Sequence, residues 1–146
     1  MEIEIKIDKQ YSEPKVVICT AEMNEAVQAL LQRIGGPRAG ELAGFQGGVA
    51  TILAPPDILR MYAEQQRVYA EAGQGIYLVR LRLYEAESML ESHRFVRISN
   101  SEIINLRKVK NMDLSLSGTI CVKLVNGHVS YVSRRYVSKI KALLGL

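Results

Sequence analysis

The amino-acid sequence predicts a mostly β fold, α+β overall, for this chain of 146 residues. From Val49 onward, short runs of β-branched and aromatic residues alternate with turn signals, a pattern typical of antiparallel strands. The strongest turn signal is Asn126-Gly127 between two apolar runs, a dipeptide that favours a two-residue hairpin turn. We therefore expect a mostly β domain over residues 45–146, preceded by a separate extension over residues 1–44.

The extension is predicted to form two strands and a helix (ββα). Ile3, Ile5 and Ile7 alternate with charged residues, which indicates a half-buried strand over residues 2–8, and residues 15–20 read as a second strand. Apolar residues then recur at helical spacing from 23 to 34, with Thr20 as a candidate N-cap.

Glycines and a proline over residues 35–48 end this helix and indicate a linker. A phosphate-binding loop is the competing interpretation. It is disfavoured because no Gly-Lys-Ser/Thr follows and the preceding element is a helix rather than a strand.

Within the domain, strands and two helices are expected in alternation with turns. The expected strands cover residues 49–53, 58–64, 67–71, 76–79, 95–98, 108–114, 119–124 and 129–132. The helices cover residues 83–90 and the carboxy-terminal residues up to Leu144, the latter with Ser133 as N-cap.

The segment after Phe95 carries the most information. Ser99 and Glu102 have the spacing of a capping box, which predicts a helical turn there and places the Asn100 amide on an exposed corner. Such an amide can pair with the edge of an adenine base. Asn105 is interpreted as structural, because an Asn between a short apolar segment and a strand more often bonds local backbone than a ligand.

Composition and motifs argue against an enzyme or a metalloprotein. Cys19 and Cys121 sit singly in apolar runs, as reduced core thiols do, and show no metal-binding spacing. His93 and His128 are isolated and expected to be solvated, and no nucleophile–base set stands out. Glu22, Glu25, Glu85 and Glu87 are expected on solvated helix faces. An acidic amino terminus and the absence of an apolar run of roughly 18 residues predict a soluble, cytoplasmic protein. No cofactor is expected.

The charge is distributed unevenly. Residues 95–146 hold nine Lys/Arg against two Asp/Glu, a net charge of +7, whereas residues 1–94 hold ten against thirteen, a net charge of −3. This layout suits a protein that presents one face to a polyanion, although a mixed, solvated surface would also explain it.

Arg134 and Arg135 begin the last helix, where a cation is mildly unfavourable. Either an anion docks there, or two exposed arginines are simply tolerated.

Three separated segments recur in a consistent order: residues 95–105 with their Ser-Asn-Ser core, the Leu124-x-Asn126-Gly127 turn, and Val132-Ser133-Arg134-Arg135-Tyr136. Together they resemble the LytTR-type DNA-binding domain of bacterial transcription regulators. The resemblance runs from about residue 45 to Leu144, and the front segment is similar to that of small regulators without a receiver domain.

The resemblance implies a cytoplasmic, mostly β regulator whose loops enter successive major grooves of double-stranded DNA at repeated half-sites. The implied base contacts are Gln66, Asn100 and Arg135, with the base preference at Gln66 left open. The implied phosphate contacts are Arg67, Arg97, Ser99, Lys108, Lys110, Ser133 and Arg134.

The resemblance implies one protein partner, a small multi-pass membrane protein that restrains the regulator. The apolar stripe of the amino-terminal helix suggests a second copy of the chain, in a homodimer, as another partner. An interaction module is the alternative function: its basic face or amino-terminal helix would bind an acidic or membrane-bound partner.

Overall fold

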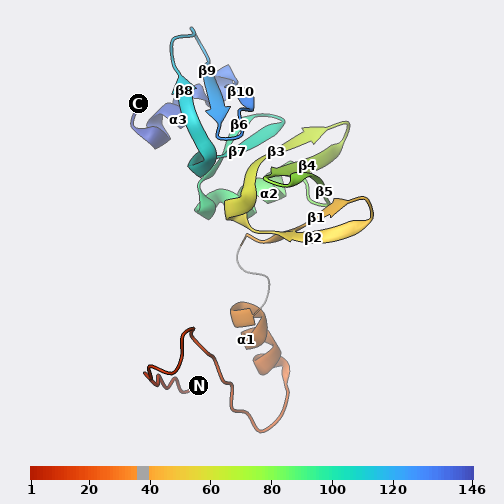
Figure 1. The fold of residues 1–146 in the computed structure, drawn as a ribbon, viewed down its shortest axis with the longest axis vertical. Helices are drawn as coiled ribbons and strands as arrows, with labels where there is room; N and C mark the ends of the chain where they lie inside the picture. Colours follow the sequence, from red (N-terminus) through yellow and green to blue (C-terminus); the bar gives the residue numbers. More distant parts are fainter. Residues whose placement is uncertain (36–39) are drawn as a thin grey trace. The chain divides into compact units, whose positions relative to one another are not determined.

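The computed structural model describes residues 1–35 and 40–146 (Figure 1). The chain divides into two units, Met1–Gly36 and Pro37–Leu146. The expected boundary between residues 44 and 45 therefore falls inside the second unit, within a strand. Part of the expected linker, residues 36–39, lies outside the described residues.

Among residues 1–35, the described part of the first unit, one helix forms, α1 (Glu25–Gly35). Asn24 rather than Thr20 caps it, because the Asn24 Oδ1 atom accepts a hydrogen bond from the Val27 amide at 3.0 Å. The expected strands over residues 2–8 and 15–20 do not form: these residues are coil, and Ile3, Ile5 and Ile7 are 79–95% exposed. Alternation alone cannot make a strand, since an isolated extended segment needs a neighbouring strand to pair its backbone groups.

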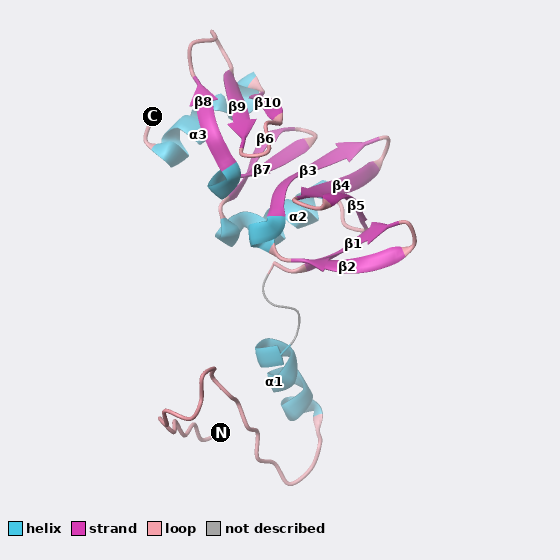
Figure 2. Cartoon of the chain, in the orientation of Figure 1, coloured by secondary structure: helices cyan, strands magenta, loops and turns pink. Residues whose placement is uncertain are grey.

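The second unit is built on a seven-stranded antiparallel sheet (Figure 2). Its strands are β1 (Leu42–Gln46), β2 (Val49–Leu53), β3 (Ile58–Glu64), β4 (Arg67–Ala72), β5 (Gly75–Val79), β6 (Phe95–Ser99) and β7 (Glu102–Asn105). They lie side by side in the order β2-β1-β5-β4-β3-β7-β6. The prediction of a mostly β fold of antiparallel sheets with short helices is confirmed.

A second, three-stranded antiparallel sheet completes the β structure. Its strands are β8 (Val109–Asp113), β9 (Ile120–Leu124) and β10 (Val129–Val132), in the order β10-β9-β8. The α-helices of this unit are α2 (Leu83–Leu90) and α3 (Arg134–Leu144), and three short 3₁₀ helices cover Pro55–Asp57 (η1), Glu91–His93 (η2) and Leu106–Lys108 (η3). The Asn126-Gly127 hairpin turn is present between β9 and β10, with Gly127 at φ +91°.

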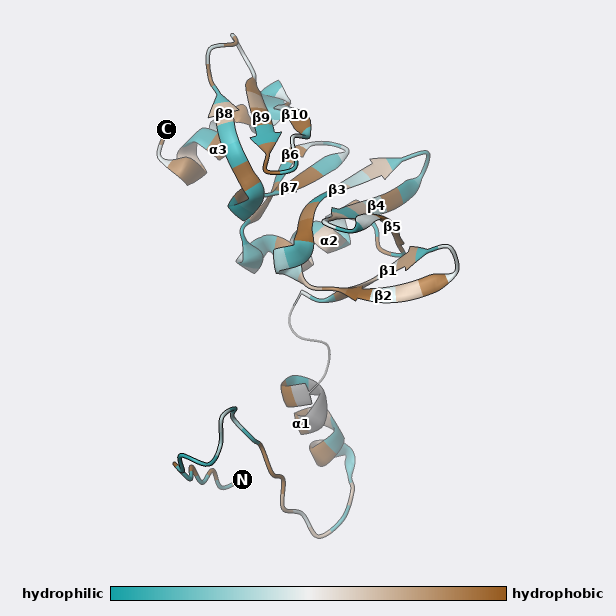
Figure 3. Ribbon diagram, in the orientation of Figure 1, coloured by the Kyte–Doolittle hydropathy of each residue, from teal (hydrophilic) through white to brown (hydrophobic). Residues whose placement is uncertain are grey.

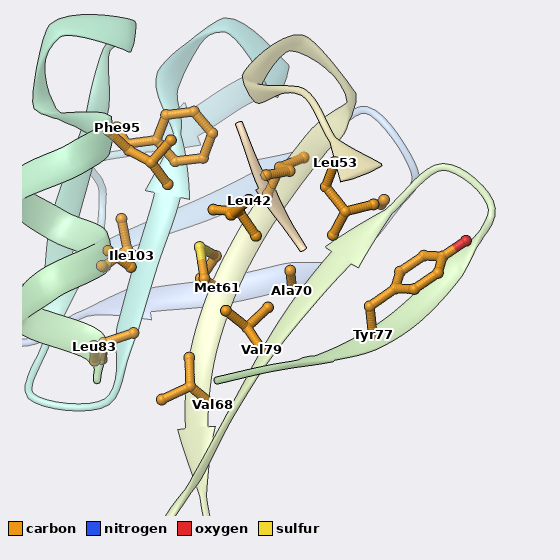
Figure 4. Close-up of a cluster of buried hydrophobic side chains, with 14 residues drawn as sticks. Leu42, Leu53, Met61, Val68, Ala70, Tyr77, Val79, Leu83, Phe95 and Ile103 are labelled. Carbon is orange, nitrogen blue, oxygen red and sulfur yellow. The ribbon is translucent and has the colours of Figure 1, made fainter. Parts of the chain in front are cut away.

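Two hydrophobic cores share the strands β3, β6 and β7. On one face of the large sheet, Met61, Phe95 and Ile103 pack with residues of α2, as Figure 4 shows for this cluster. On the other face, alternate residues such as Val96 and Ile104 pack against the small sheet and α3. Figure 3 shows hydrophobic (brown) segments on strands of both sheets, among hydrophilic (teal) ones.

Several local expectations are wrong. Residues 102–105 form strand β7 instead of a helical turn, and Ser99 pairs with Glu102 across a hairpin. The burial of Ile103 and Ile104 in two different cores favours a strand over the local capping signal. The glycine-rich linker is likewise interrupted by β1, which pairs with both β2 and β5.

The cysteines are not core thiols, because Cys19 is exposed and Cys121 is half-buried. Asn105, by contrast, is structural as predicted. Its Nδ2 group donates to the Ile58 carbonyl at 2.8 Å, and its Oδ1 atom accepts from the Arg107 amide at 3.0 Å.

Candidate nucleic-acid interface

Two hairpin turns project from the same end of the large sheet. Strands β3 and β7 are neighbours, with Tyr62 opposite Glu102, and the Ala63 amide donates to the Ser101 carbonyl at 2.8 Å. The β3–β4 turn therefore lies next to the β6–β7 turn, at the same end of the sheet (Figure 1). Gln66 lies in the first turn and Asn100 in the second.

The first turn of α3 joins this end of the sheet. The Ser133 amide donates to the Ile98 carbonyl at 2.8 Å, and the Tyr136 hydroxyl donates to Asn100 Oδ1 at 3.3 Å. These contacts place the start of α3 beside the β6–β7 turn. The two turns and the start of α3 together are called the reading edge from here on.

Gln66 owes its position to a tight two-residue turn. Gln65 and Gln66 have φ values of +50° and +67°, both in the left-handed region. Two such residues match the twist of an antiparallel hairpin, although Asn and Gly adopt this conformation more readily than Gln. Gln66 and the adjacent Arg67, the first residue of β4, are both exposed.

Arg134 and Arg135 occupy the first turn of α3, and both are exposed. Ser133 holds the N-cap position, but its side chain makes no capping hydrogen bond. Arg134 lies against Gly118, where an added Cβ atom would be 3.2 Å from the guanidinium Nε. Two guanidinium groups beside open helix amides form a region that attracts anions.

Arg97 faces protein acceptors instead of solvent. Its Nε donates to the Ser99 carbonyl at 2.8 Å, its Nη2 to the Asn100 carbonyl at 2.6 Å, and its Nη1 pairs with Glu87 Oε2 at 2.8 Å. The side chain is only 15% exposed. Glu87 is therefore not the freely solvated helix residue that the sequence suggested.

Ser99 also faces inward to the turn. It is half-buried, and its hydroxyl accepts a hydrogen bond from the Ser101 amide at 3.2 Å. This local bond shapes the turn in the way that short hydroxyl side chains commonly do.

Lys108 and Lys110 lie away from the reading edge. β7 starts at the β6–β7 turn and ends at Asn105, so Lys108 in η3 follows the opposite end of that strand. The Lys108 carbonyl accepts from the Val125 amide, next to the β9–β10 turn, and Lys110 follows shortly after on β8. Among the expected phosphate contacts, Lys108 and Lys110 therefore form a basic region that is separate from the reading edge.

A polar network links the two sheets just below the reading edge. Arg60 pairs with Glu71 at 2.5 Å and with Glu102 at 3.6 Å, and the Ser130 hydroxyl of β10 donates to Glu102. The Arg60 guanidinium also lies 4.1 Å from the centre of the Tyr62 ring. Burial raises the pKa of Tyr62 above 10.0, and the nearby Arg60 charge partly opposes that increase.

Neither histidine is simply solvated. His128 Nε2 lies 2.9 Å from the Ser130 hydroxyl and extends the polar network. His93 Nε2 is buried, and no hydrogen-bond partner for it occurs among residues 1–35 and 40–146.

Sequence reasoning missed two residues that matter at the reading edge, Glu87 and Tyr136. Helical spacing could have found both, since Glu87 is four residues after the buried Leu83 and Tyr136 four before the buried Ile140. Each therefore lies near the packed side of its helix.

In the described part of the chain, no helix is long and apolar enough to cross a membrane. Nor do the described residues include a group of three or more side chains suited to hold a metal ion.

An exposed basic edge with two hairpin turns and a helix start is compatible with a nucleic-acid-binding domain. The family model of the LytTr DNA-binding domain matches residues 49–145. The chain belongs to the LytTR DNA-binding domain family, which confirms the resemblance drawn from the sequence. This is a family of DNA-binding domains and not a class of enzymes.

Similar proteins agree with this assignment. An uncharacterized HTH-type transcriptional regulator of Staphylococcus aureus strain MSSA476 is 29% identical over 147 residues, covering 100% of this chain and 99% of that protein. The corresponding regulator of strain COL matches to the same extent.

A solved structure shares the fold. The LytTr DNA-binding domain of a methyl-accepting/DNA response regulator from Bacillus cereus matches with a TM-score of 0.70 at 22% identity. The match covers 73% of this chain and 97% of that domain. In a helix-turn-helix motif, the recognition helix follows another helix across a short turn. In this chain, α3 follows the strand β10 instead.

Proposed function

We propose that this chain is a bacterial transcription regulator that binds double-stranded DNA at specific sequences through the reading edge. The observation that carries the proposal is the joining of Asn100, Gln66 and the start of α3 at one end of the sheet. Their exposed amide and guanidinium groups are those that pair with adenine and guanine in the major groove.

The three proposed base contacts are Gln66, Asn100 and Arg135. Arg67, Ser133 and Arg134 are placed beside them and are proposed as phosphate contacts. Lys108 and Lys110 would reach phosphates farther along the duplex, since they lie beyond the opposite end of β7. Ser99 and Arg97 would act mainly through the shape of the turn.

Membership of the LytTR family supports a further proposal, the recognition of repeated half-sites in a promoter. The protein would act in the cytoplasm, where bacterial DNA is accessible to it. The net charge of +7 over residues 95–146 supports a strong electrostatic component of binding.

Selection from a random duplex pool tests this proposal. We expect a defined sequence to be enriched, and its affinity to fall linearly with the logarithm of the salt concentration. A pool that shows no enrichment after several rounds would contradict sequence-specific binding.

A second candidate function is association with another protein through the first unit. Ile3, Ile5, Ile7 and Val17 expose 69–95% of their surface in this unit. Association would bury these apolar side chains against a partner. The partner would be a second copy or a membrane-bound regulator, and this function can coexist with DNA binding. A pool without enrichment, together with sedimentation of the full chain as a dimer, would favour this candidate alone.

A further inference from the structure

The β6–β7 turn that carries Asn100 is irregular as well as exposed. Arg97 pairs with Ile103 and Ser99 pairs with Glu102, so one extra residue, Ile98, is inserted on β6. Such a β-bulge changes the direction of the side chains that follow it. The bulge therefore helps to set where Asn100 points.

Arg97 holds the backbone of this turn. Its guanidinium donates to two successive carbonyls, those of Ser99 and Asn100, at 2.8 and 2.6 Å. The planar, forked shape of the guanidinium suits two acceptors at a fixed angle. Because Asn100 lies between peptide groups that Arg97 restrains, the direction of its Cα–Cβ bond is restrained too.

Glu87 holds Arg97 in turn. Its Oε2 atom accepts from Arg97 Nη1 at 2.8 Å, and α2 is anchored in the core by Leu83, Ala86 and Leu90. The two side chains are 15% and 35% exposed, so the pair is partly screened from solvent. This arrangement connects a rigid helix to the tip of the turn.

We propose that Glu87 determines DNA sequence specificity without touching DNA, by fixing Arg97 and so the orientation of Asn100. This inference rests on the proposed function, because it assigns a cause to the discrimination made by Asn100. Without Glu87, the guanidinium is free to leave the two carbonyls. The turn must then be ordered when DNA binds, which lowers the affinity for the cognate sequence.

The decisive variant is Glu87→Gln, because an electrostatic role and a positioning role of Glu87 predict opposite changes in the affinity for the cognate duplex. It removes a negative charge, so electrostatics alone predicts equal or tighter binding to any duplex. Positioning predicts a loss of cognate affinity of about five- to tenfold, the lower end of the cost of one base contact. Affinity for a random duplex of the same length should stay equal or rise slightly.

The experiment uses the full chain and compares the cognate duplex with a random one at several salt concentrations. Glu91→Gln is the matched control, since it makes the same charge change at an exposed position just after α2. It should leave the ratio of cognate to random affinity unchanged. Thermal unfolding of each variant verifies that the fold is retained.

Arg97→Lys separates a positioning role from a phosphate contact. Lysine keeps the charge but lacks the forked donors, so we expect the same loss of discrimination as in Glu87→Gln and an unchanged salt slope. The double variant should lose no more discrimination than either single variant, because both changes remove the same restraint on Asn100. A phosphate contact would instead preserve discrimination in Arg97→Lys, and Arg97→Ala would reduce the salt slope by about one.

A spectroscopic measurement gives a readout without DNA. The Arg97 Nε–H signal in a ¹⁵N–¹H spectrum should be protected in the wild type and lost in Glu87→Gln, with shifts of the Asn100 and Ser101 amide signals. Failure of the wild type to discriminate any sequence would overturn the proposed function together with this inference. Unchanged discrimination in both Glu87→Gln and Glu87→Ala, with a discriminating wild type, would overturn this inference alone.

Discussion

At the scale of single residues, the reading edge combines groups that face outward with groups that support them. Asn100 is exposed, yet its Oδ1 atom accepts a hydrogen bond from the Tyr136 hydroxyl at 3.3 Å. An amide side chain can rotate and exchange its donor and acceptor ends. The Tyr136 hydroxyl favours the orientation in which Oδ1 lies near α3.

Tyr136→Phe should therefore weaken discrimination by Asn100 without changing the fold. We expect the ratio of cognate to random affinity to fall by roughly two- to fivefold, the effect of losing one neutral hydrogen bond of about 0.5–1 kcal/mol. Competition binding with two duplexes measures it. Tyr131→Phe is a suitable control, because Tyr131 is exposed on β10. An equal effect of both changes would argue against orientation by Tyr136.

Residue types indicated the outward groups but not their supports. Asn100, Arg134 and Arg135 stand out in the sequence because a Ser-Asn-Ser corner and a basic helix start are unusual. The roles of Arg97 and Glu87 depend on a contact between β6 and α2, ten residues apart. Helical spacing could place Glu87 near the packed side of its helix, but only the fold shows that Arg97 is its partner.

At the scale of elements, the β3–β4 hairpin holds the proposed base contact Gln66 in a turn that also affects stability. Gln65 and Gln66 both adopt positive φ values, a conformation that costs a residue with a Cβ atom some free energy. Two glutamines at such a turn are a compromise, which is explained if Gln66 has a functional task.

Replacing the pair through Gln65→Asn and Gln66→Gly should separate these two demands. We expect the free energy of unfolding to rise by about 0.5–1 kcal/mol, because Asn-Gly suits the left-handed turn. Discrimination at the base that Gln66 contacts should be lost at the same time. Chemical denaturation and duplex competition measure the two effects. A variant that is more stable and equally specific would remove Gln66 from the set of base contacts.

Most strands were predictable because their signals are local. Strand β3 and the β3–β4 turn occur at the expected positions, since alternation and a polar turn suffice to define a hairpin. Strand β7 was not predictable in this way. Its four residues carry a capping signal, and only the pairing of β7 with both β3 and β6 makes it a strand.

The amino-terminal strands failed for the opposite reason. Ile3, Ile5 and Ile7 have a clear alternating pattern, but the pattern says nothing about whether a partner strand exists. Within the first unit these residues remain coil and exposed. A strong local pattern without a partner is thus a poor predictor of a sheet.

At the scale of the second unit, two hydrophobic cores brace the end of the sheet from which the turns project. α2 packs with β3, β6 and β7 on one face, and α3 with the small sheet on the other. Both helices send a polar side chain to the β6–β7 turn, Glu87 through Arg97 and Tyr136 directly. A surface fixed from both sides loses little conformational entropy on binding.

Only some basic residues of the carboxy-terminal segment lie at the reading edge. Arg134 and Arg135 lie at the reading edge, whereas Lys108 and Lys110 follow the far end of β7. The net charge of the segment predicted a polyanion partner, but the sequence alone could not divide the basic residues between two regions. The direction of β7 determines which of these basic residues lie at the reading edge and which lie at the opposite end.

The comparison of Asn100→Ala with Lys110→Ala tests the central claim most directly. Affinities of both variants and the wild type are measured for the selected duplex and a random one at several salt concentrations. Asn100→Ala should lower the discrimination by about 1–3 kcal/mol, whereas Lys110→Ala should weaken both duplexes equally. Unchanged discrimination in Asn100→Ala would contradict the claim that the reading edge recognises the DNA sequence.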